Sequence, residues 1–387
     1  MKKIFLYIPA LFFFSLAQTD AYAQDNLQPH YLLERIARLQ VREDPFFLPG
    51  IFPSYITSTE KFSRRKKDNN IFFNGLITYI LKNDRSYLSP ADQSLVDTIV
   101  SREQSLFASF RNRNGRNTYN FWRTDAAYPF PYTWWIHILK KSTDLPDDMD
   151  DTVFSLFALD ASDSSAEMLH QLMQNFTGTD GRNVRISNPA FRKLPVYSSW
   201  FGKKFPVVPD ICVLCNILTF VQIHRLGWTA ADSASLQFIC QAIGTGEIIR
   251  HPLQVSPYYG KTAIILYHIA RLMAVHTIPQ LEILKPRLIG LAVQQLAGTE
   301  NILEKSVLAS AVLKWGYQPP EFQLPALNEL PANIEENDFP FFIGDIPSYL
   351  KKTARNFLQV NRLGLFYHYC PAFNDALLLD YLILLKK

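Results

Sequence analysis

Four aspartates within five positions open an apolar helix in the stretch Pro146-Asp147-Asp148-Met149-Asp150-Asp151-Thr152-Val153-Phe154-Ser155-Leu156-Phe157-Ala158-Leu159. Carboxylates this close together cannot all ionise freely at a partly buried site. Either one carboxyl group stays protonated and can act as an acid, or the cluster binds a cation. Aspartate is also common at the N-cap and first turn of a helix, but four aspartates exceed what capping needs.

Six apolar segments have the length and periodicity of helices buried on all sides. They cover residues 71–81, 150–159, 210–225, 258–275, 302–315 and 371–385. More amphipathic segments alternate with them, at residues 31–42, 91–110, 166–176, 230–243, 279–296 and, broken by prolines, 319–330. This alternation is typical of a closed ring of helical hairpins, in which the inner helices pack on both sides.

We therefore predict an all-α fold, an (α/α)6 toroid. A helical solenoid is the alternative, although its repeats should resemble one another more closely and need not number six pairs.

The N-terminus has the pattern of a secretory signal. Lys2 and Lys3 precede an apolar run over residues 4–16, and Ala21-Tyr22-Ala23 offers small residues at a cleavage site. Such a run is too short to anchor the chain in a bilayer. We expect residues 1–23 to be a signal peptide.

The remaining chain, residues 24–387, is predicted to form one toroid domain, because no Gly/Ser-rich or low-complexity linker divides it. No later segment is long and uncharged enough to span a membrane, and no cysteine follows the apolar run as it would in a lipoprotein. The expected location is therefore exported, either periplasmic or secreted.

The composition supplies a large core, since 48% of the residues are hydrophobic and 14% aromatic. The formal net charge of +4 is spread over 387 residues, so no electrostatic footprint for nucleic acid is expected. Four cysteines are few for an exported disulfide scaffold. Cys212 and Cys215 lie within an apolar helical run, where packed thiols are the ordinary interpretation and a redox or zinc pair is the alternative.

Polar residues begin several of the predicted inner helices. In a toroid these helices run the same way, so their N-terminal ends meet at one mouth, where they stabilise negative charge. We predict that Asp148, Asp150 and Asp151 are the catalytic candidates. Substrate-binding candidates at the same mouth are Asp210, Asn216, Trp134, Trp135, Tyr258, Tyr259 and His368.

The run Asp148-Met149-Asp150-Asp151-Thr152 and the apolar helix after it resemble the D-x-D-D-T motif and inner helix of class II terpenoid cyclases, the squalene-hopene cyclase group, which are built from α/α toroids. This resemblance implies that Asp150 donates a proton to an isoprenoid or similar apolar substrate and that Asp148 and Asp151 tune it. The Q-x-x-x-G-x-W repeats of those cyclases are absent, and the chain has room for one toroid.

Most of the mature chain is also similar, more loosely, to uncharacterised exported bacterial proteins of the terpenoid cyclase/protein prenyltransferase toroid superfamily. The similar segments are Asn216-Ile217-Leu218, residues 259–272 and Cys370-Pro371-Ala372. That similarity implies a fold and no known activity.

Two metal-dependent chemistries of that superfamily need motifs that this sequence carries only in part. Residues 147–151 satisfy the D-D-x-x-D magnesium motif of class I synthases, but the nearest second motif, at Asn374-Asp375, has Leu378 and Leu382 where Ser and Glu are required. Protein prenyltransferases bind zinc through an aspartate, a cysteine and a histidine, which Asp210, Cys212 and His368 resemble only in part. We expect no metal and no cofactor.

Two further functions stay open. Aspartates and aromatic rings at a toroid mouth are also suited to binding or cleaving carbohydrates, either with paired carboxyl groups or with a Tyr/His pair as in toroid lyases. A non-catalytic binding or scaffold protein is the third possibility. The expected ligand is a small molecule, a lipid or a glycan, and whether the chain is an enzyme stays open.

Overall fold

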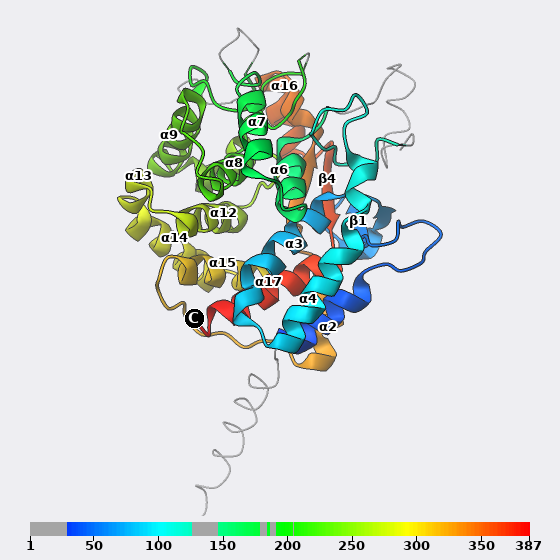
Figure 1. The fold of residues 1–387 in the computed structure, drawn as a ribbon. Helices are drawn as coiled ribbons and strands as arrows, with labels where there is room; N and C mark the ends of the chain where they lie inside the picture. The colour runs from blue at the N-terminus through cyan, green and yellow to red at the C-terminus, as the bar shows by residue number, and fades with distance from the viewer. Residues whose placement is uncertain (1–28, 126–145, 179–183, 186–190, 204) are drawn as a thin grey trace, which may run out of the picture.

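The computed structural model describes residues 29–125, 146–178, 184–185, 191–203 and 205–387, and within them the chain is rich in helix with one small sheet (Figure 1). Six of the described helices form an inner set in which most residues are buried. They are α3 (Phe72–Asp84), α6 (Met149–Ala158), α8 (Ile211–Ile223), α12 (Thr262–Val275), α15 (Ile302–Lys314) and α17 (Pro371–Leu384).

These six helices contact one another in chain order. Helix α3 contacts α6, α6 contacts α8, α8 contacts α12, α12 contacts α15, and α15 contacts α17. Helix α17 in turn contacts α3, so the series of contacts returns to its start. The six apolar segments predicted from the sequence correspond to these six helices.

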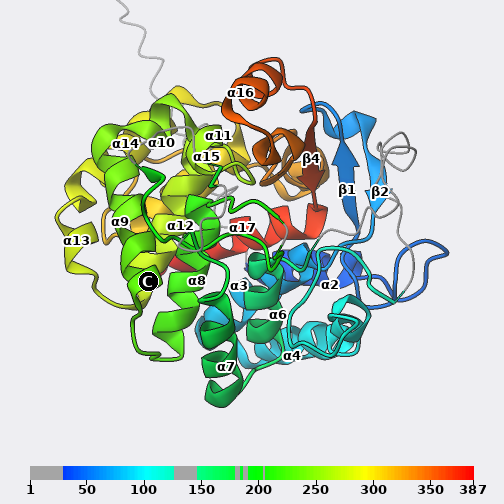
Figure 2. The same cartoon turned by 90° about the horizontal axis from the view of Figure 1, so that it is seen from above.

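Helices with one buried and one exposed face cover this inner set (Figure 2). Helix α2 packs on α17 and α4, α4 on α3, α7 and α9 on α8, and α14 on α15 and α12. Their bounds are α2 (Pro29–Leu39), α4 (Pro90–Glu103), α7 (Asp163–Met173), α9 (Ala230–Thr245) and α14 (Lys285–Gly298).

Several predicted outer helices are shorter than expected. The segment 91–110 ends as a helix at Glu103 and continues as a single turn at Leu106–Phe110, and 279–296 divides into α13 (Pro279–Glu282) and α14. The segment 319–330 is not a helix: it is irregular up to the turn Leu327–Glu329. Its three prolines remove backbone donors and break the periodic pattern.

The remaining described helices are short. They are α10 (Glu247–Arg250), α11 (Pro252–Val255) and α16 (Lys352–Val360), and single turns lie at Phe62–Arg64, Arg85–Tyr87, Pro331–Glu335 and Ile346–Tyr349.

A four-stranded antiparallel sheet departs from the all-α expectation. Its strands are β1 (Ser54–Thr57), β2 (Lys66–Asp68), β3 (Phe342–Asp345) and β4 (Leu365–Tyr369), in the order β2-β1-β4-β3. The register places Tyr55 opposite Tyr369, and Phe342 opposite His368. The segment that precedes α17 is therefore a buried strand. The sequence predicted only that His368, within this segment, lies at the mouth.

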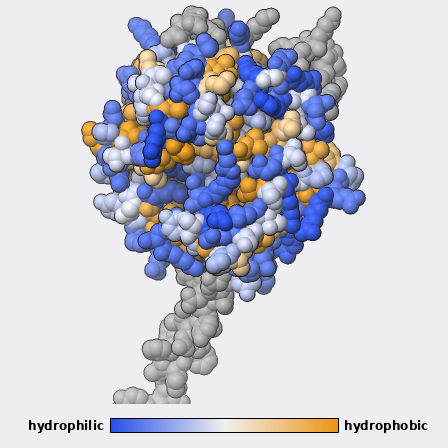
Figure 3. Space-filling view, viewed as in Figure 1, coloured by the Kyte–Doolittle hydropathy of each residue, from blue (hydrophilic) through white to orange (hydrophobic). Residues whose placement is uncertain are grey.

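The inner helices approach one another closely where α3 crosses α6. A Cβ atom added at Gly75 would lie 2.7 Å from Phe154 Cβ, so only glycine allows the observed contact. On the face drawn in Figure 3, hydrophobic residues form separate patches among hydrophilic ones. Within the described ranges, no helix combines the length and the hydrophobicity that crossing a bilayer requires.

Candidate functional site

Asp148 is the N-cap of α6. Its backbone is extended, and its Oδ1 accepts hydrogen bonds from the backbone N–H groups of Asp150 (2.6 Å) and Asp151 (3.2 Å). This is the ordinary use of aspartate at a helix start, because the first N–H groups of a helix lack partners within it. Asp148 thus turns the chain into α6 and determines where the next two carboxyl groups lie.

Asp147 anchors the cluster to the preceding loop. Its Oδ2 accepts hydrogen bonds from Asn112 Nδ2 (2.6 Å) and Arg116 Nη2 (2.7 Å), and also from the Thr118 hydroxyl. The ion pair with Arg116 compensates the charge of this buried carboxylate. Two of the four aspartates therefore have evident structural roles.

Asp150, in the first turn of α6, contacts side chains from α8 and from the turn before α12. Its Oδ1 accepts a hydrogen bond from Asn216 Nδ2 of α8 at 2.7 Å, and its Oδ2 accepts one from the hydroxyl of Tyr259, in the turn before α12. All three side chains are almost completely buried. The structure thus brings together three of the residues singled out in the sequence.

A buried arginine extends this group. Arg271 of α12 donates from Nη2 to Asn216 Oδ1 at 2.6 Å, and its guanidinium lies 4.9 Å from the ring centroid of Tyr79 and 5.4 Å from that of Phe154. Aromatic faces stabilise a cation that has left water. Asn216 therefore links the carboxyl group of Asp150 to a positive charge held between rings.

Two buried groups beside this chain of contacts have no hydrogen-bond partner among the described residues. Neither carboxyl oxygen of Asp151 has one, and His268 Nε2 also lacks one. His268 Nδ1 lies 2.8 Å from the carbonyl oxygen of Ile264, which assigns the proton to Nδ1 and leaves Nε2 as an acceptor. The His268 ring meets that of Tyr259 edge to face at 4.6 Å.

Burial is the largest influence on the pKa values of Asp148, Asp150 and Asp151. It raises the pKa of Asp150 to about 6, although the hydrogen bonds from Tyr259 and Asn216 and the charge of Arg271 oppose it. Burial raises the pKa of Asp151 well above its usual range, and the charge of Asp148 adds to the effect. A buried carboxylate without a donor is costly, so Asp151 favours its neutral form.

Asp210 clamps the start of α8 to the turn before α12. Its Oδ1 accepts from the backbone N–H groups of Cys212 (2.8 Å) and Val213 (3.3 Å) and from Ser256 Oγ (2.7 Å), while Oδ2 accepts from the Tyr258 N–H (2.8 Å). Burial raises its pKa to about 7. Because both oxygens are used in this way, Asp210 positions the turn that carries Tyr259. The sequence predicted Asp210 as a substrate-binding residue, but its oxygens are not presented to a ligand.

An aromatic cluster surrounds Tyr259, whose hydroxyl donates to Asp150. Phe342 of β3 contacts Phe72 at 4.7 Å and Tyr259 at 5.6 Å between ring centroids, and the adjacent Phe341 contacts Tyr259 and His268 at 5.9 and 5.6 Å. We call Phe72, Phe341, Phe342 and Tyr259 the aromatic cluster. The buried carboxyl group of Asp150 is therefore hydrogen-bonded to one member of this cluster.

Two other predicted substrate-binding residues lie at the edge of this cluster. The Tyr258 hydroxyl accepts from Trp200 Nε1 at 2.7 Å, and its ring stacks on Phe342 at 6.3 Å. His368 lies 5.3 Å from the Phe342 ring, and its Nδ1 is 3.4 Å from Asp68 Oδ2. Both contact Phe342 and not Asp150. Trp134 and Trp135 lie outside the described residues.

The cysteines are free, and three of them are buried. Cys212 Sγ lies 3.3 Å from Ser256 Oγ. His368 belongs to β4 and contacts Phe342 and Asp68 instead. Among the described residues, no group of three or more His, Cys, Asp or Glu side chains is placed to hold a metal ion. The zinc arrangement of Asp210, Cys212 and His368 therefore does not form in this part of the chain.

Arg271, His268, Phe341 and Phe342 were not predicted as site residues. The signal for the first two was present, since an arginine and a histidine three residues apart interrupt the apolar run of α12 and share one face. Phe341 and Phe342 carry no such signal, because only contacts between distant segments bring them against Tyr259.

Comparison with known proteins gives no relative from which a function can be carried over: no protein-family model, no curated protein and no solved structure matches the chain.

Proposed function

We propose that this chain is an exported (α/α)6 toroid that binds an apolar, isoprenoid-like molecule inside its ring and transfers a proton to it from Asp150. The closed series of contacts among the six buried helices supports the toroid. The observation that carries the acid chemistry is Asp150 itself, a buried carboxyl group with a pKa of about 6 that is held by Asn216 and Tyr259 beside aromatic rings.

In the proposed reaction, the Asp150 proton moves to one carbon of a C=C bond. The π electrons of that bond form the new C–H bond and leave a carbocation on the other carbon. The carboxylate that forms is stabilised by the Tyr259 hydroxyl and the Asn216 amide, which already donate to it. The faces of Phe72 and Phe342 offer stabilisation to the cation, and the reaction ends when the cation gives up a proton to the Asp150 carboxylate, which forms a new C=C bond and regenerates the acid.

Substrate entry requires Phe341 and Phe342 to move, because both pack on Tyr259, which donates to Asp150. Phe342 begins β3, whose partner in the sheet is β4, and Phe341 immediately precedes this strand. Separation of a short strand from the sheet is the smallest change that would uncover the carboxyl group.

Carbohydrate chemistry at Asp150 is less well supported. Glycoside hydrolysis needs two carboxyl groups with separate roles beside a sugar. Here Asp148 caps a helix and Asp210 clamps two segments, while apolar rings pack around Tyr259, the partner of Asp150. The surroundings favour an apolar substrate.

Deuterium transfer tests the proposal. The purified protein would be incubated in D2O with squalene and with polyprenyl alcohols, and the products analysed by mass spectrometry. We expect a cyclised or isomerised product with deuterium on carbon, lost in Asp150→Asn and retained in Asp163→Asn, which changes an exposed aspartate at the start of α7. No conversion by the wild type, or equal deuterium transfer by Asp150→Asn, would contradict it.

A further inference from the structure

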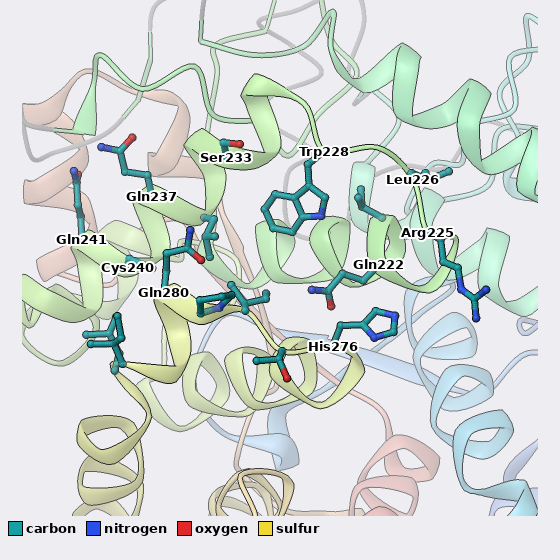
Figure 4. A pocket seen from close by; sticks show the side chains of 17 residues that line it. Gln222, Arg225, Leu226, Trp228, Ser233, Gln237, Cys240, Gln241, His276 and Gln280 are labelled. Atoms are coloured by element: carbon teal, nitrogen blue, oxygen red, sulfur yellow. The ribbon is translucent and has the colours of Figure 1, made fainter.

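A cavity of about 960 Å³ lies beside the C-terminal ends of two inner helices, α8 and α12 (Figure 4). Gln222 at the end of α8 and His276 after α12 line it, whereas the partners of Asp150 are Asn216, further back in α8, and Tyr259, before α12. Residues between Ser233 and Gln241 of α9 and the start of α13 complete the walls. Its volume falls within the range of roughly 300–1,000 Å³ that is usual for small-molecule sites.

The lining has a distinctive chemistry. Four glutamine side chains face the cavity, and none of the described residues that line it is acidic, although the chain has 35 Asp and Glu residues. Arg225 is the one Arg or Lys side chain among them. The glutamines are Gln222, Gln237, Gln241 and Gln280.

Gln222 has an unused acceptor at this cavity. The residue is only 7% exposed, and its Oε1 has no hydrogen-bond partner among the described residues. A buried amide oxygen without a donor costs free energy, so such a group calls for a ligand or water that donates to it. Figure 4 shows the Gln222 amide, the Trp228 ring and the His276 ring around the same part of the cavity.

Trp228 supplies an aromatic wall. It lies in the loop between α8 and α9 and is 42% exposed, an unusually large exposure for a side chain of this size. An exposed indole face beside the unsatisfied amide of Gln222 and three more amides offers one flat apolar surface and several groups that both donate and accept hydrogen bonds.

We propose that this cavity binds a neutral saccharide, with one sugar ring stacked on Trp228 and a hydroxyl group donating to Gln222 Oε1. Sugar hydroxyls both donate and accept hydrogen bonds, as glutamine amides do, and the C–H face of a sugar packs on an indole. A nucleobase held between the Trp228 and His276 rings is the alternative that the titration distinguishes. This inference is independent of the proton transfer proposed for Asp150.

The test is titration of the purified protein with neutral cello-, xylo-, chito- and malto-oligosaccharides, followed by tryptophan fluorescence and calorimetry. We expect saturable binding of at least one series, weakened about tenfold or more by Trp228→Ala and several-fold by Gln222→Leu. The matched control is Tyr317→Ala, which removes another exposed ring, 59% exposed and not part of the cavity lining. It should bind as the wild type does.

Three results would overturn the saccharide site. One is the absence of binding by every series at about 10 mM, where even weak specific binding is visible. Another is binding that Trp228→Ala and Gln222→Leu leave unchanged while both variants keep wild-type melting temperatures. The third is binding of nucleosides, with no saccharide bound, at the same cavity.

Discussion

At Asp150, two opposing effects decide the state of one proton. Burial favours the neutral acid, while Tyr259, Asn216 and Arg271 favour the carboxylate. The resulting pKa of about 6 is well suited to an acid that must give up and regain a proton near neutral pH. A carboxyl group that served only to cap a helix would not need this balance.

The difference in stability between the wild type and the Asp150→Asn variant should therefore depend on pH. The pKa of Asp150 rises from 3.8 in the unfolded chain to about 6 in the folded one, so the stabilisation it provides is complete below pH 3.8 and is lost as the pH rises through 6. Relative to the wild type, Asp150→Asn should gain up to about 3 kcal/mol in the free energy of unfolding between about pH 4 and pH 7. Denaturant melts of both proteins over this range measure the gain, and a difference that stays constant with pH would refute it.

Asp148 should behave differently because it acts as an N-cap. Asp148→Ala removes the acceptor for the N–H groups of Asp150 and Asp151 and should lower the free energy of unfolding by about 1 kcal/mol. Asp148→Asn, which keeps a capping oxygen, is the control and should lose less. Urea melts at pH 7 measure both, and equal losses in the two variants would argue against the cap.

Among the helices, the contact between α3 and α6 depends on one missing side chain. Gly75→Ala should destabilise the protein by about 1–3 kcal/mol, although alanine favours helices, because its Cβ would lie 2.7 Å from that of Phe154. Gly290→Ala in α14, where nothing lies within 4 Å, should instead stabilise it by about 0.5–1 kcal/mol. Thermal melts of the two variants measure this contrast, and shifts of the same sign would contradict the close packing of α3 on α6.

The inner helices were largely predictable from the sequence. Segments 302–315 and 371–385 appear as Ile302–Lys314 and Pro371–Leu384, because apolar periodicity and local start signals specify such helices. The sheet was not predictable. Its strands are short, and β1 pairs with β4, about 300 residues further along the chain, so no local pattern reports the pairing.

The candidate site was predictable only in part, for the same reason. Asp150 lies in the first turn of α6, Asn216 in α8 and Tyr259 just before α12, and the hydrogen bonds among them agree with the expected convergence of these helices. The use of Asp210 as a clamp and the contact of Phe342 with Tyr259 depend on contacts between distant segments. Chemistry-bearing residues could be named from the sequence, but the division between structural and reactive carboxyl groups needed the fold.

For the molecule as a whole, the proposed export predicts a processed N-terminus. The positively charged start, the apolar run and Ala21-Tyr22-Ala23 indicate cleavage, so the protein isolated from its native source should begin near Gln24. Intact-mass and N-terminal peptide analysis by mass spectrometry determine this. Recovery of a mature protein that still carries residues 1–16 would contradict it.

Whether Asp150 is a proton-donating acid is tested most directly by its pKa. Carbon-13 NMR of the aspartate carboxyl groups, recorded across the pH range for the wild type and for Asp150→Asn, identifies the resonance that the substitution removes. We expect that resonance to titrate with a midpoint near pH 6. A midpoint at or below about 4, the ordinary value for aspartate, would show a permanently ionised structural carboxylate and contradict the account.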